Sequence, residues 1–175
     1  MTVVFQIPEL ETERLRLRAP RLDDWPALCD FYASDRSKFV GGPMTAEQTW
    51  RSLATETGHW ALRGFGRWAL EEKATGRYVG ICGLWEPDGF PEMELGWDLW
   101  ADATGKGYAT EAGAAARAHA YGALGRKTVI SMIAPGNDAS KAVASRLGAS
   151  FEKAFTHVTF GEVEVWRHPG PEAAS

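Results

Sequence analysis

The stretch that decides the fold runs from residue 104 to residue 124 and reads TGKGYATEAGAAARAHAYGAL. Two glycines enclose Lys106, and a segment made mostly of alanine follows them at once. A turn needs only one glycine, and a helix that packs in a core usually carries larger apolar side chains. The stretch therefore predicts a turn and a helix that lie unusually close to something else.

A strand, a Gly-x-Gly turn and a helix together form an arrangement that binds anions. The first amides of a helix lack partners within the helix, and glycine brings them near a phosphate without an intervening Cβ. Two well-known phosphate motifs do not fit, because Thr110 stands where a dinucleotide fingerprint needs glycine and Gly107 where a P-loop needs serine or threonine. An anion cradle of another type is expected, and a flexible glycine loop before a tightly packed helix is the alternative.

Composition narrows the class of protein and its partners. The 175 residues are enough for one domain with a sizeable core, and 45% of them are hydrophobic. A net charge of −4 disfavours nucleic acid, and no apolar run approaches the ~18 residues of a membrane span. The N-terminus does not resemble a secretory signal, and the cysteines and histidines lack metal-ligand spacing. We expect a cytoplasmic protein without nucleic-acid, membrane or metal partners.

The hydrophobic pattern predicts an α+β domain over residues 1–168, followed by a disordered tail at 169–175. The expected order is β-α-α-β-β-β-α-β-α-β-β, which gives a single mixed, mostly antiparallel sheet of about seven strands flanked by helices. A right-handed crossover is expected to bring strand 127–134 beside strand 92–100. Thr45 followed by Gln48 predicts a capping box, and Asn137 or Asp138 is expected to cap the last helix.

Three blocks of sequence resemble the GNAT acetyltransferases. The superfamily's pyrophosphate loop, [Q/R]-x-x-G-x-[G/A] between the fourth strand and a helix, falls on residues 104–109. The opening LETERLRLRAPRLDDWPAL (10–28) and the segment NDASKAVASRLGA (137–149) are similar to the RimJ/RimL-like branch, which includes the ribosomal-protein N-terminal acetyltransferases. The blocks occur in the right order over nearly the whole chain, so the resemblance implies the acyl-CoA N-acyltransferase fold.

The resemblance implies acetyl-CoA as the cosubstrate and no metal. A bulge is expected to splay strand 92–100 from strand 127–134, which would free backbone amides for the pantetheine arm and the oxyanion. Asn137 can cap a helix, contact the pantetheine, or do both. The residues that the resemblance assigns to the coenzyme are Trp97, Leu99, Thr104, Gly105, Lys106, Gly107, Tyr108, Ala109, Thr110, Asn137 and Ser140.

Three positions depart from the family's pattern. Thr104 stands where glutamine or arginine usually begins the loop, and Ala149 replaces the usual aromatic residue after Leu-Gly. Ala144 occupies the position where many members carry a tyrosine that protonates the leaving thiolate. Ser140 is then the candidate hydrogen-bond donor to the sulfur. The departures also leave an alternative, a non-catalytic acyl-CoA-binding or sensor module on the same fold.

Acetyl transfer to an amine needs a base, since an alkylammonium with a pKa of about 10 is not nucleophilic. Glu92, Glu94 and Asp98 share one face of a strand by the two-residue period. Glu94 matches the family's strand-four glutamate best, and partial burial would raise its pKa. A solvent-facing row of carboxylates is the alternative, favoured for Glu92 and Asp98 and evenly balanced for Glu94, so the sequence leaves open whether Glu92, Glu94 or neither is the base.

The acceptor pocket of this fold is expected from segments 25–60, 84–92 and 155–165. An aromatic, mildly acidic pocket favours a cationic primary amine, on a small molecule or a protein N-terminus. The hairpin 155–166 could supply a homodimer interface, although no pattern requires one. The aromatic and acidic residues of these segments are Trp25, Trp50, Trp60, Trp85, Phe90, Phe155, Phe160, Glu86 and Asp88.

Overall fold

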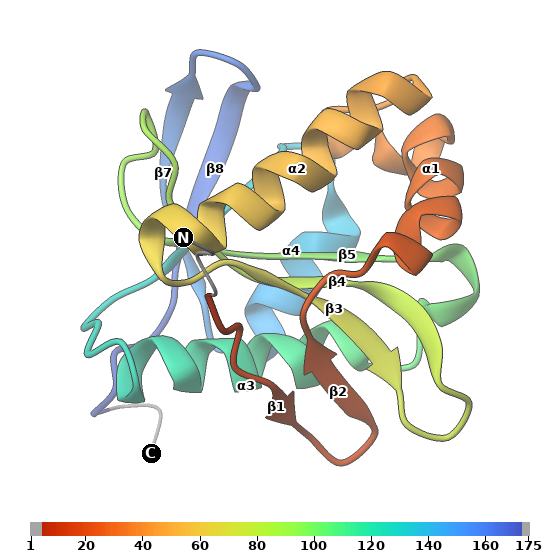
Figure 1. The fold of residues 1–175 in the computed structure, drawn as a ribbon. Coiled ribbons are helices and arrows are strands. Elements are labelled where there is room, and N and C mark those ends of the chain that lie inside the picture. The colour runs from red at the N-terminus through yellow and green to blue at the C-terminus, as the bar shows by residue number, and fades with distance from the viewer. Residues whose placement is uncertain (1–4, 173–175) are drawn as a thin grey trace.

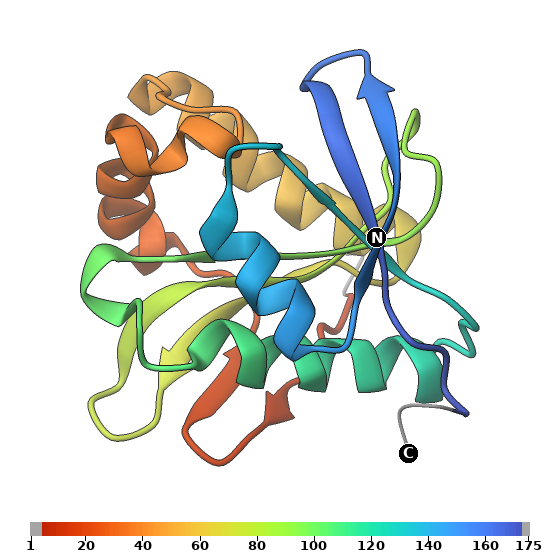
Figure 2. The same ribbon diagram turned by 180° about the vertical axis from the view of Figure 1, so that it is seen from behind.

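A computed structural model describes residues 5–172, which form one eight-stranded sheet with helices on both faces (Figures 1 and 2). The strand order is β1-β2-β3-β4-β5-β6-β8-β7, and every pairing is antiparallel except that of β5 with β6. The strands are β1 Leu10–Glu11, β2 Leu15–Arg18, β3 Arg67–Glu72, β4 Arg77–Trp85, β5 Glu94–Leu99, β6 Ile130–Ile133, β7 Ser150–His157 and β8 Gly161–Arg167. The helices are α1 Trp25–Ala33, α2 Ala46–Arg63, α3 Tyr108–Gly122 and α4 Asp138–Arg146.

The predicted fold class is confirmed, with one more strand than expected. The additional strand is β1, two residues that pair with β2 through Leu10 and Leu17. Such a short strand has too few residues to display a two-residue period. The predicted caps are also present: Thr45 and Gln48 form a reciprocal capping box at α2, and the Asn137 side chain accepts the amide of Ser140 at α4.

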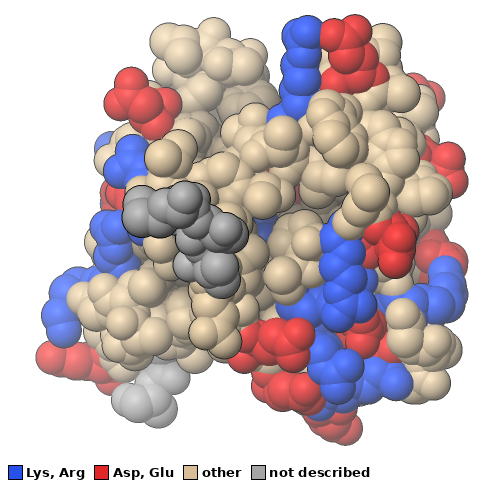
Figure 3. Space-filling view, viewed as in Figure 1, with Lys and Arg blue, Asp and Glu red and all other residues tan. Residues whose placement is uncertain are grey.

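The two faces of the central sheet carry separate apolar clusters. On one face, Leu28 and Phe31 of α1 pack with Ile81 and Trp100 of the sheet side. On the opposite face, α3 lies across the strands and covers the larger cluster (Figure 1). Over the first strands, basic and acidic side chains intermingle at the surface (Figure 3), because they form ion pairs such as Arg16 with Glu71.

The alanines of α3 allow this helix to pack closely. Ala112, Ala116 and Ala120 are fully buried against the sheet. A Cβ atom added to Gly113 would lie 2.9 Å from a methyl group of Leu147, in the turn after α4. Larger side chains would therefore push α3 away from both the sheet and α4. The close approach that the sequence predicts is confirmed.

The sheet opens between β5 and β6. These parallel strands share a single register pair, Glu94 with Ile130, before they separate. β5 nevertheless pairs with β4 without interruption from Glu94 to Leu99, so the expected bulge is absent from that register. The opening comes instead from β6, which follows β8 and the rising β7–β8 hairpin away from the rest of the sheet (Figure 1). Among residues 5–172, β5 thus has no strand partner on its β6 side beyond Glu94.

Several other predictions concern the ends and surface of the chain. The predicted tail 169–175 is described only to residue 172, and within it the carbonyl of Pro169 accepts a hydrogen bond from the Tyr121 hydroxyl. No helix within residues 5–172 has the length and apolar character needed to cross a membrane. The β7–β8 hairpin exposes Phe151 and Val158, and its role as a homodimer interface stays a prediction.

Candidate active site

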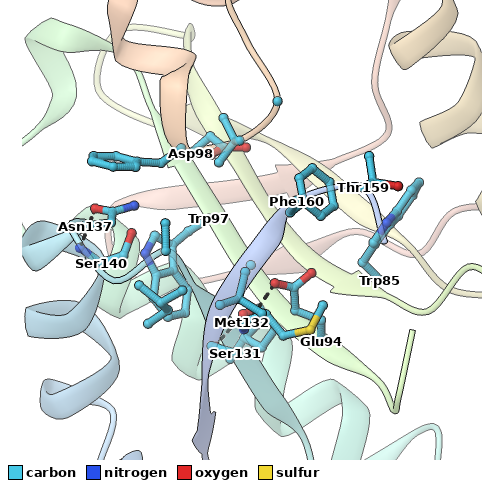
Figure 4. A pocket seen from close by; sticks show the side chains of 18 of the residues that line it. Trp85, Glu94, Trp97, Asp98, Ser131, Met132, Asn137, Ser140, Thr159 and Phe160 are labelled. Atoms are coloured by element: carbon cyan, nitrogen blue, oxygen red, sulfur yellow. Dashed lines mark hydrogen bonds between the residues drawn. The ribbon is translucent and has the colours of Figure 1, made fainter. Parts of the chain in front are cut away.

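A cavity of about 360 Å³ occupies the opening between β5 and β6 (Figure 4). Of the residues predicted for the site, Glu94, Trp97, Asn137 and Ser140 line it. Leu99 and the loop 104–110 do not. The other lining residues come mainly from the loop before α2, the ends of β3 and β4, strand β6 and the β7–β8 turn. They include Lys38, Phe39, Gly41, Arg67, Trp85, Phe90, Asp98, Ser131, Met132, Thr159 and Phe160.

Glu94 is placed where β5 and β6 separate. Its Oε1 accepts a hydrogen bond from the backbone amide of Met132 at 3.3 Å. Burial raises the pKa of Glu94 to about 7, because the charged carboxylate loses most of its hydration, and nearby Arg67 only partly offsets this effect. Near neutral pH the side chain can therefore both accept and release a proton.

Asp98 and Glu92 have structural partners, unlike Glu94. Asp98 is 6% exposed and pairs with the guanidinium of Arg67 at 3.0 Å, so its expected place in a solvent-facing row is wrong. Arg67 also binds Glu56 of α2, whose second oxygen is buried without a partner among residues 5–172. Glu92 forms an ion pair with Arg167. Glu94 is thus the carboxylate of this face without an ionic partner in the described chain.

The sequence analysis missed Arg67 and Glu56. Both lie in ordinary amphipathic patterns, and only the tertiary packing brings Glu56 of α2 to Arg67, which lines the cavity. The Arg67 guanidinium carbon lies 5.5 Å from the centroid of the Trp85 ring. The same ring stacks on His59 at 4.3 Å. These two contacts hold Trp85 in one wall of the cavity.

Asn137 and Ser140 lie at the far end of the cavity from Glu94 (Figure 4). The Oδ1 atom of Asn137 caps α4 at 3.2 Å from the amide of Ser140. The Asn137 amide nitrogen donates to no other group in residues 5–172, so it remains available to a ligand. Both predicted roles of Asn137, as the cap of α4 and as a contact of the pantetheine arm, are therefore compatible with the geometry. The Ser140 hydroxyl likewise makes no hydrogen bond within the described residues.

The Gly-x-Gly loop adopts the backbone that only glycine tolerates well. Gly105 has φ of +76° and Gly107 has φ of +83°, both in the left-handed region. Gly107 is the N-cap of α3 and brings no side-chain acceptor, so the amides of the first turn remain open. The Thr110 hydroxyl in that turn is buried and has no partner among residues 5–172. This arrangement suits an anionic ligand.

Three side chains of the loop are engaged elsewhere. The Thr104 hydroxyl donates to the carbonyl of Ala101. The Tyr108 phenol is buried and donates to Glu72, while Lys106 lies above the Tyr108 ring. Any contact of Thr104 or Tyr108 with a coenzyme would therefore use the backbone. Sequence analysis also missed Arg14, whose guanidinium donates to the carbonyl of Lys106 and pairs with Glu111.

The aromatic wall is smaller than predicted. Trp85, Phe90 and Phe160 line the cavity, and Phe39 joins them from the loop before α2. The remaining predicted residues do not line it. Trp60 lies in the core, Trp25 and Trp50 contact each other, and Glu86 pairs with Arg126; Phe155 and Asp88 are also outside. Glu86 and Asp88, the acidic residues predicted for the wall, therefore do not contribute to it, and the carboxylates that line the cavity are Glu94 and Asp98.

A buried hydrogen-bond chain joins the cavity to α3. The Ser131 hydroxyl donates to the carbonyl of Leu95 at 2.6 Å, and so it ties β6 to β5 beside the opening. Nε2 of His168 lies 2.9 Å from the same hydroxyl, and Nδ1 lies 3.2 Å from Arg117. Burial and the nearby guanidinium lower the pKa of His168 to about 3, so the ring is neutral and donates from Nε2. Sequence analysis gave this histidine no role.

Comparisons with known proteins identify the family. The family model described as acetyltransferase (GNAT) domain matches residues 14–150. The chain belongs to the GNAT acetyltransferase family. A crystal structure of an acetyltransferase from Agrobacterium tumefaciens strain C58 is 37% identical, covers 96% of this chain and 98% of its own, and has a TM-score of 0.86. Protein YkkB of Bacillus subtilis is 29% identical over 83% of this GNAT chain and 87% of YkkB.

The fold neighbours of this GNAT acetyltransferase include RimL. The structure of that protein, the ribosomal L7/L12 alpha-N-protein acetyltransferase in complex with coenzyme A, has a TM-score of 0.76. The likeness covers 93% of this chain and 98% of RimL at 16% identity, which establishes a shared fold.

Proposed function

We propose that this GNAT acetyltransferase moves the acetyl group of acetyl-CoA to a primary amine by direct transfer in a ternary complex. The amine belongs to a small molecule or to a protein N-terminus. The observation that carries the proposal is Glu94, a carboxylate enclosed where β5 and β6 separate, with a pKa of about 7. A general base works best when its pKa lies near the working pH.

The α3 N-terminus and the α4 cap fit a coenzyme that carries a diphosphate. Acetyl-CoA supplies an acetyl group activated as a thioester. Two observations support the fit: the buried Thr110 hydroxyl lacks a partner among residues 5–172, and the Asn137 amide nitrogen faces the cavity unpaired. The assigned residues are Trp97, Leu99, Thr104, Gly105, Lys106, Gly107, Tyr108, Ala109, Thr110, Asn137 and Ser140.

Each remaining step uses a group that lies along β5 or α4. Glu94 takes a proton from the incoming amine, directly or through a water molecule, and thereby makes the nitrogen nucleophilic. Backbone amides of β5 between Trp97 and Leu99 hold the carbonyl oxygen of the acetyl group, since this side of β5 has no strand partner. Ser140 donates a hydrogen bond to the departing sulfur. Ser140 thus takes the role of the tyrosine that many family members carry at position 144, where this chain has alanine.

Two measurements on one preparation test the proposal. Calorimetry with coenzyme A reports binding, and release of free thiol from acetyl-CoA with a panel of amines and peptides reports turnover. We expect both activities in the wild type, and for Ser140→Ala we expect binding to persist while turnover falls about tenfold, as for one lost hydrogen bond to a charged group. Ser145→Ala, in the same helix but outside the cavity lining, is the matched control.

The results separate the proposal from the non-catalytic alternative. Binding without thiol release on the whole panel would support a binding or sensor module. Absence of both binding and release would reject the proposal and the alternative together. The enclosed carboxylate favours the enzyme, because a module that only binds acyl-CoA gains nothing from a half-buried glutamate without an ionic partner among residues 5–172, which is costly to keep.

A further inference from the structure

We infer that the acceptor is a small amino-acid-like monoamine, with an aromatic group beside its amine and a carboxylate directed to Lys38. The inference rests on the proposed function, because it takes the space around Glu94 as the acceptor site. It differs from what the sequence predicted, a pocket whose acidic residues attract a cationic amine. Three features of the cavity carry it: an aromatic wall, the absence of a second free carboxylate in the lining, and one unpaired cation.

The aromatic wall lies on the Glu94 side of the cavity. Figure 4 shows the carboxylate of Glu94 directed toward the space beside Phe160 and Trp85, away from Asn137 and Ser140. Amine nitrogen bound to Glu94 would therefore bring its substituents against these rings. An apolar substituent gains from leaving water there, and an aromatic one can also stack on the rings.

This wall is preformed. The Phe160 ring packs on His157 at 4.9 Å between centroids, and Phe90 packs on the same histidine at 5.0 Å. Nδ1 of His157 accepts the amides of Thr159 and Phe160, which fixes the turn between β7 and β8. Yet Phe160 remains 48% exposed. A rigid, exposed ring beside a half-buried carboxylate gains binding energy at little entropic cost when an apolar ligand covers it.

The carboxylates of the lining are already committed, except for Glu94. Asp98 binds Arg67, and Arg67 binds Glu56 from beneath. These three groups carry one net negative charge, which favours a single ammonium near Glu94. A second ammonium along the wall would find no acidic partner in the described lining. A polyamine or an aminoglycoside would therefore lose the hydration of its further charges without compensation.

Lys38 is the cation that this cavity leaves unpaired. It lies in the 3₁₀ turn Asp35–Phe39 that borders the cavity, and its ammonium stands 4.9 Å from the centroid of the Phe39 ring. It makes no ion pair within residues 5–172, whereas the guanidinium of Arg67 is fully engaged. The ring and the ammonium form a site for an anionic group attached to an apolar body.

The size of the cavity limits the acceptor further. Its 360 Å³ lies at the lower end of the range for ligand pockets, and the thioester end of the coenzyme must share it. Only a small amine fits beside that end. Phenylalanine has the features that the site requires: one ammonium, one ring and one carboxylate. It serves as the probe for the class.

Thiol release with four amines and acetyl-CoA tests the inference. The probes are phenylalanine, phenylalaninamide, alanine and spermidine. Wild-type kcat/KM should be highest for phenylalanine and lowest for spermidine. Lys38→Ala should lower kcat/KM for phenylalanine about tenfold, the effect of one charged hydrogen bond, and leave phenylalaninamide unchanged. The comparison of Lys38→Ala with the wild type uses the same amine with two enzymes, so the pKa of the amine cancels; the wild-type ranking is made after correction of each kcat/KM for the fraction of neutral amine.

Two further variants complete the experiment. Phe160→Ala should lower kcat/KM for phenylalanine and phenylalaninamide but not for alanine. Lys153→Ala, which removes an exposed lysine of β7, is the matched charge control and should change nothing. Circular dichroism and coenzyme affinity equal to the wild type establish that the Lys38 and Phe160 variants are folded.

The outcomes distinguish this inference from the proposed function. A preference for spermidine, or an equal loss with phenylalanine and phenylalaninamide in Lys38→Ala, would overturn the inference and leave acetyl transfer intact. Wild-type kcat/KM for phenylalaninamide equal to that for phenylalanine, after both are corrected for the fraction of neutral amine, would overturn the carboxylate requirement and point to peptide N-termini. Failure of every amine to release thiol would instead reject the proposed function.

Discussion

Replacement of Glu94 by glutamine tests the chemistry of the site most directly. Glutamine keeps the shape of the side chain, and its carbonyl oxygen can still accept the amide of Met132. The change removes only the ability to take a proton. We expect kcat/KM to fall by about 10² to 10⁴, the usual contribution of a general base. Coenzyme affinity should stay near the wild-type value, because Glu94 lies away from Asn137 and Ser140.

The pH dependence supplies the sharper measurement. With a pKa of about 7, Glu94 becomes a competent base as the pH rises through neutrality. The ratio of wild-type to Glu94→Gln kcat/KM should therefore rise about tenfold per pH unit below 7 and level off above it. Taking the ratio cancels the ionisation of the amine. A ratio that does not vary between pH 5 and 8 would refute the assignment. Glu92→Gln is the control, since it removes a carboxylate two residues away that is paired with Arg167.

The same variant should be more stable than the wild type at higher pH. Burial raises the pKa of Glu94 from its ordinary 4.5 to about 7, so the folded state holds a proton that the unfolded chain releases. The stability that this provides is present below pH 4.5 and is lost as the pH rises through 7, at about 1.4 kcal/mol per pH unit. Glu94→Gln should gain up to about 3 kcal/mol over the wild type between pH 4 and pH 8 in urea unfolding. A constant difference would contradict the burial of this carboxylate.

Three further substitutions probe the fold around the site. Gly107→Ala forces a side chain into left-handed backbone at a cost of about 1 kcal/mol, so coenzyme affinity by calorimetry should fall while the far-ultraviolet spectrum is kept. Ser131→Val removes the hydroxyl that lies between the carbonyl of Leu95 and the ring of His168. It should raise KM for acetyl-CoA severalfold more than Ser131→Thr, which keeps a hydroxyl. Equal KM values would argue against a role for these hydrogen bonds in holding β6 to β5. Thr45→Ala removes the cap of α2, at a residue outside the cavity lining, and should lower Tm by about 2 to 4 °C without changing kcat/KM.

The sequence predicts the parts of this protein that depend on neighbours along the chain. Thr45 meets Gln48 three residues later, and Asn137 meets Ser140 in the same way, so both caps are encoded locally. The two-residue period of β5 likewise brings Glu94 onto a definite face. Resemblance to the family then indicates which element carries the coenzyme loop, because the Gly-x-Gly turn is a compact signal.

Other features could not be read from the chain because they join distant segments. Arg67 of β3 reaches Asp98 of β5 across β4 and binds Glu56 of α2, and none of the three positions is unusual in its own pattern. Nothing in these local patterns shows that Asp98 forms an ion pair and that Glu94, within residues 5–172, does not. Glu86 is a second example, because its position in a predicted pocket segment does not show that its carboxylate pairs with Arg126. Pairing of charges is decided by tertiary contacts, which leave no trace in a local period.

The buried His168 affects how the free energy of unfolding changes in mild acid. Because its pKa is about 3 in the folded protein and about 6.5 in the unfolded chain, between these pH values His168 is protonated only in the unfolded state. Unfolding therefore gains one proton at His168 and loses one at Glu94 throughout the interval from pH 4.5 to pH 6.5, and the two exchanges balance. Over this interval the contributions of Glu94 and His168 to the pH dependence of stability therefore cancel. In Glu94→Gln the contribution of the His168 imidazole is no longer offset, and stability should rise more steeply with pH than in the wild type.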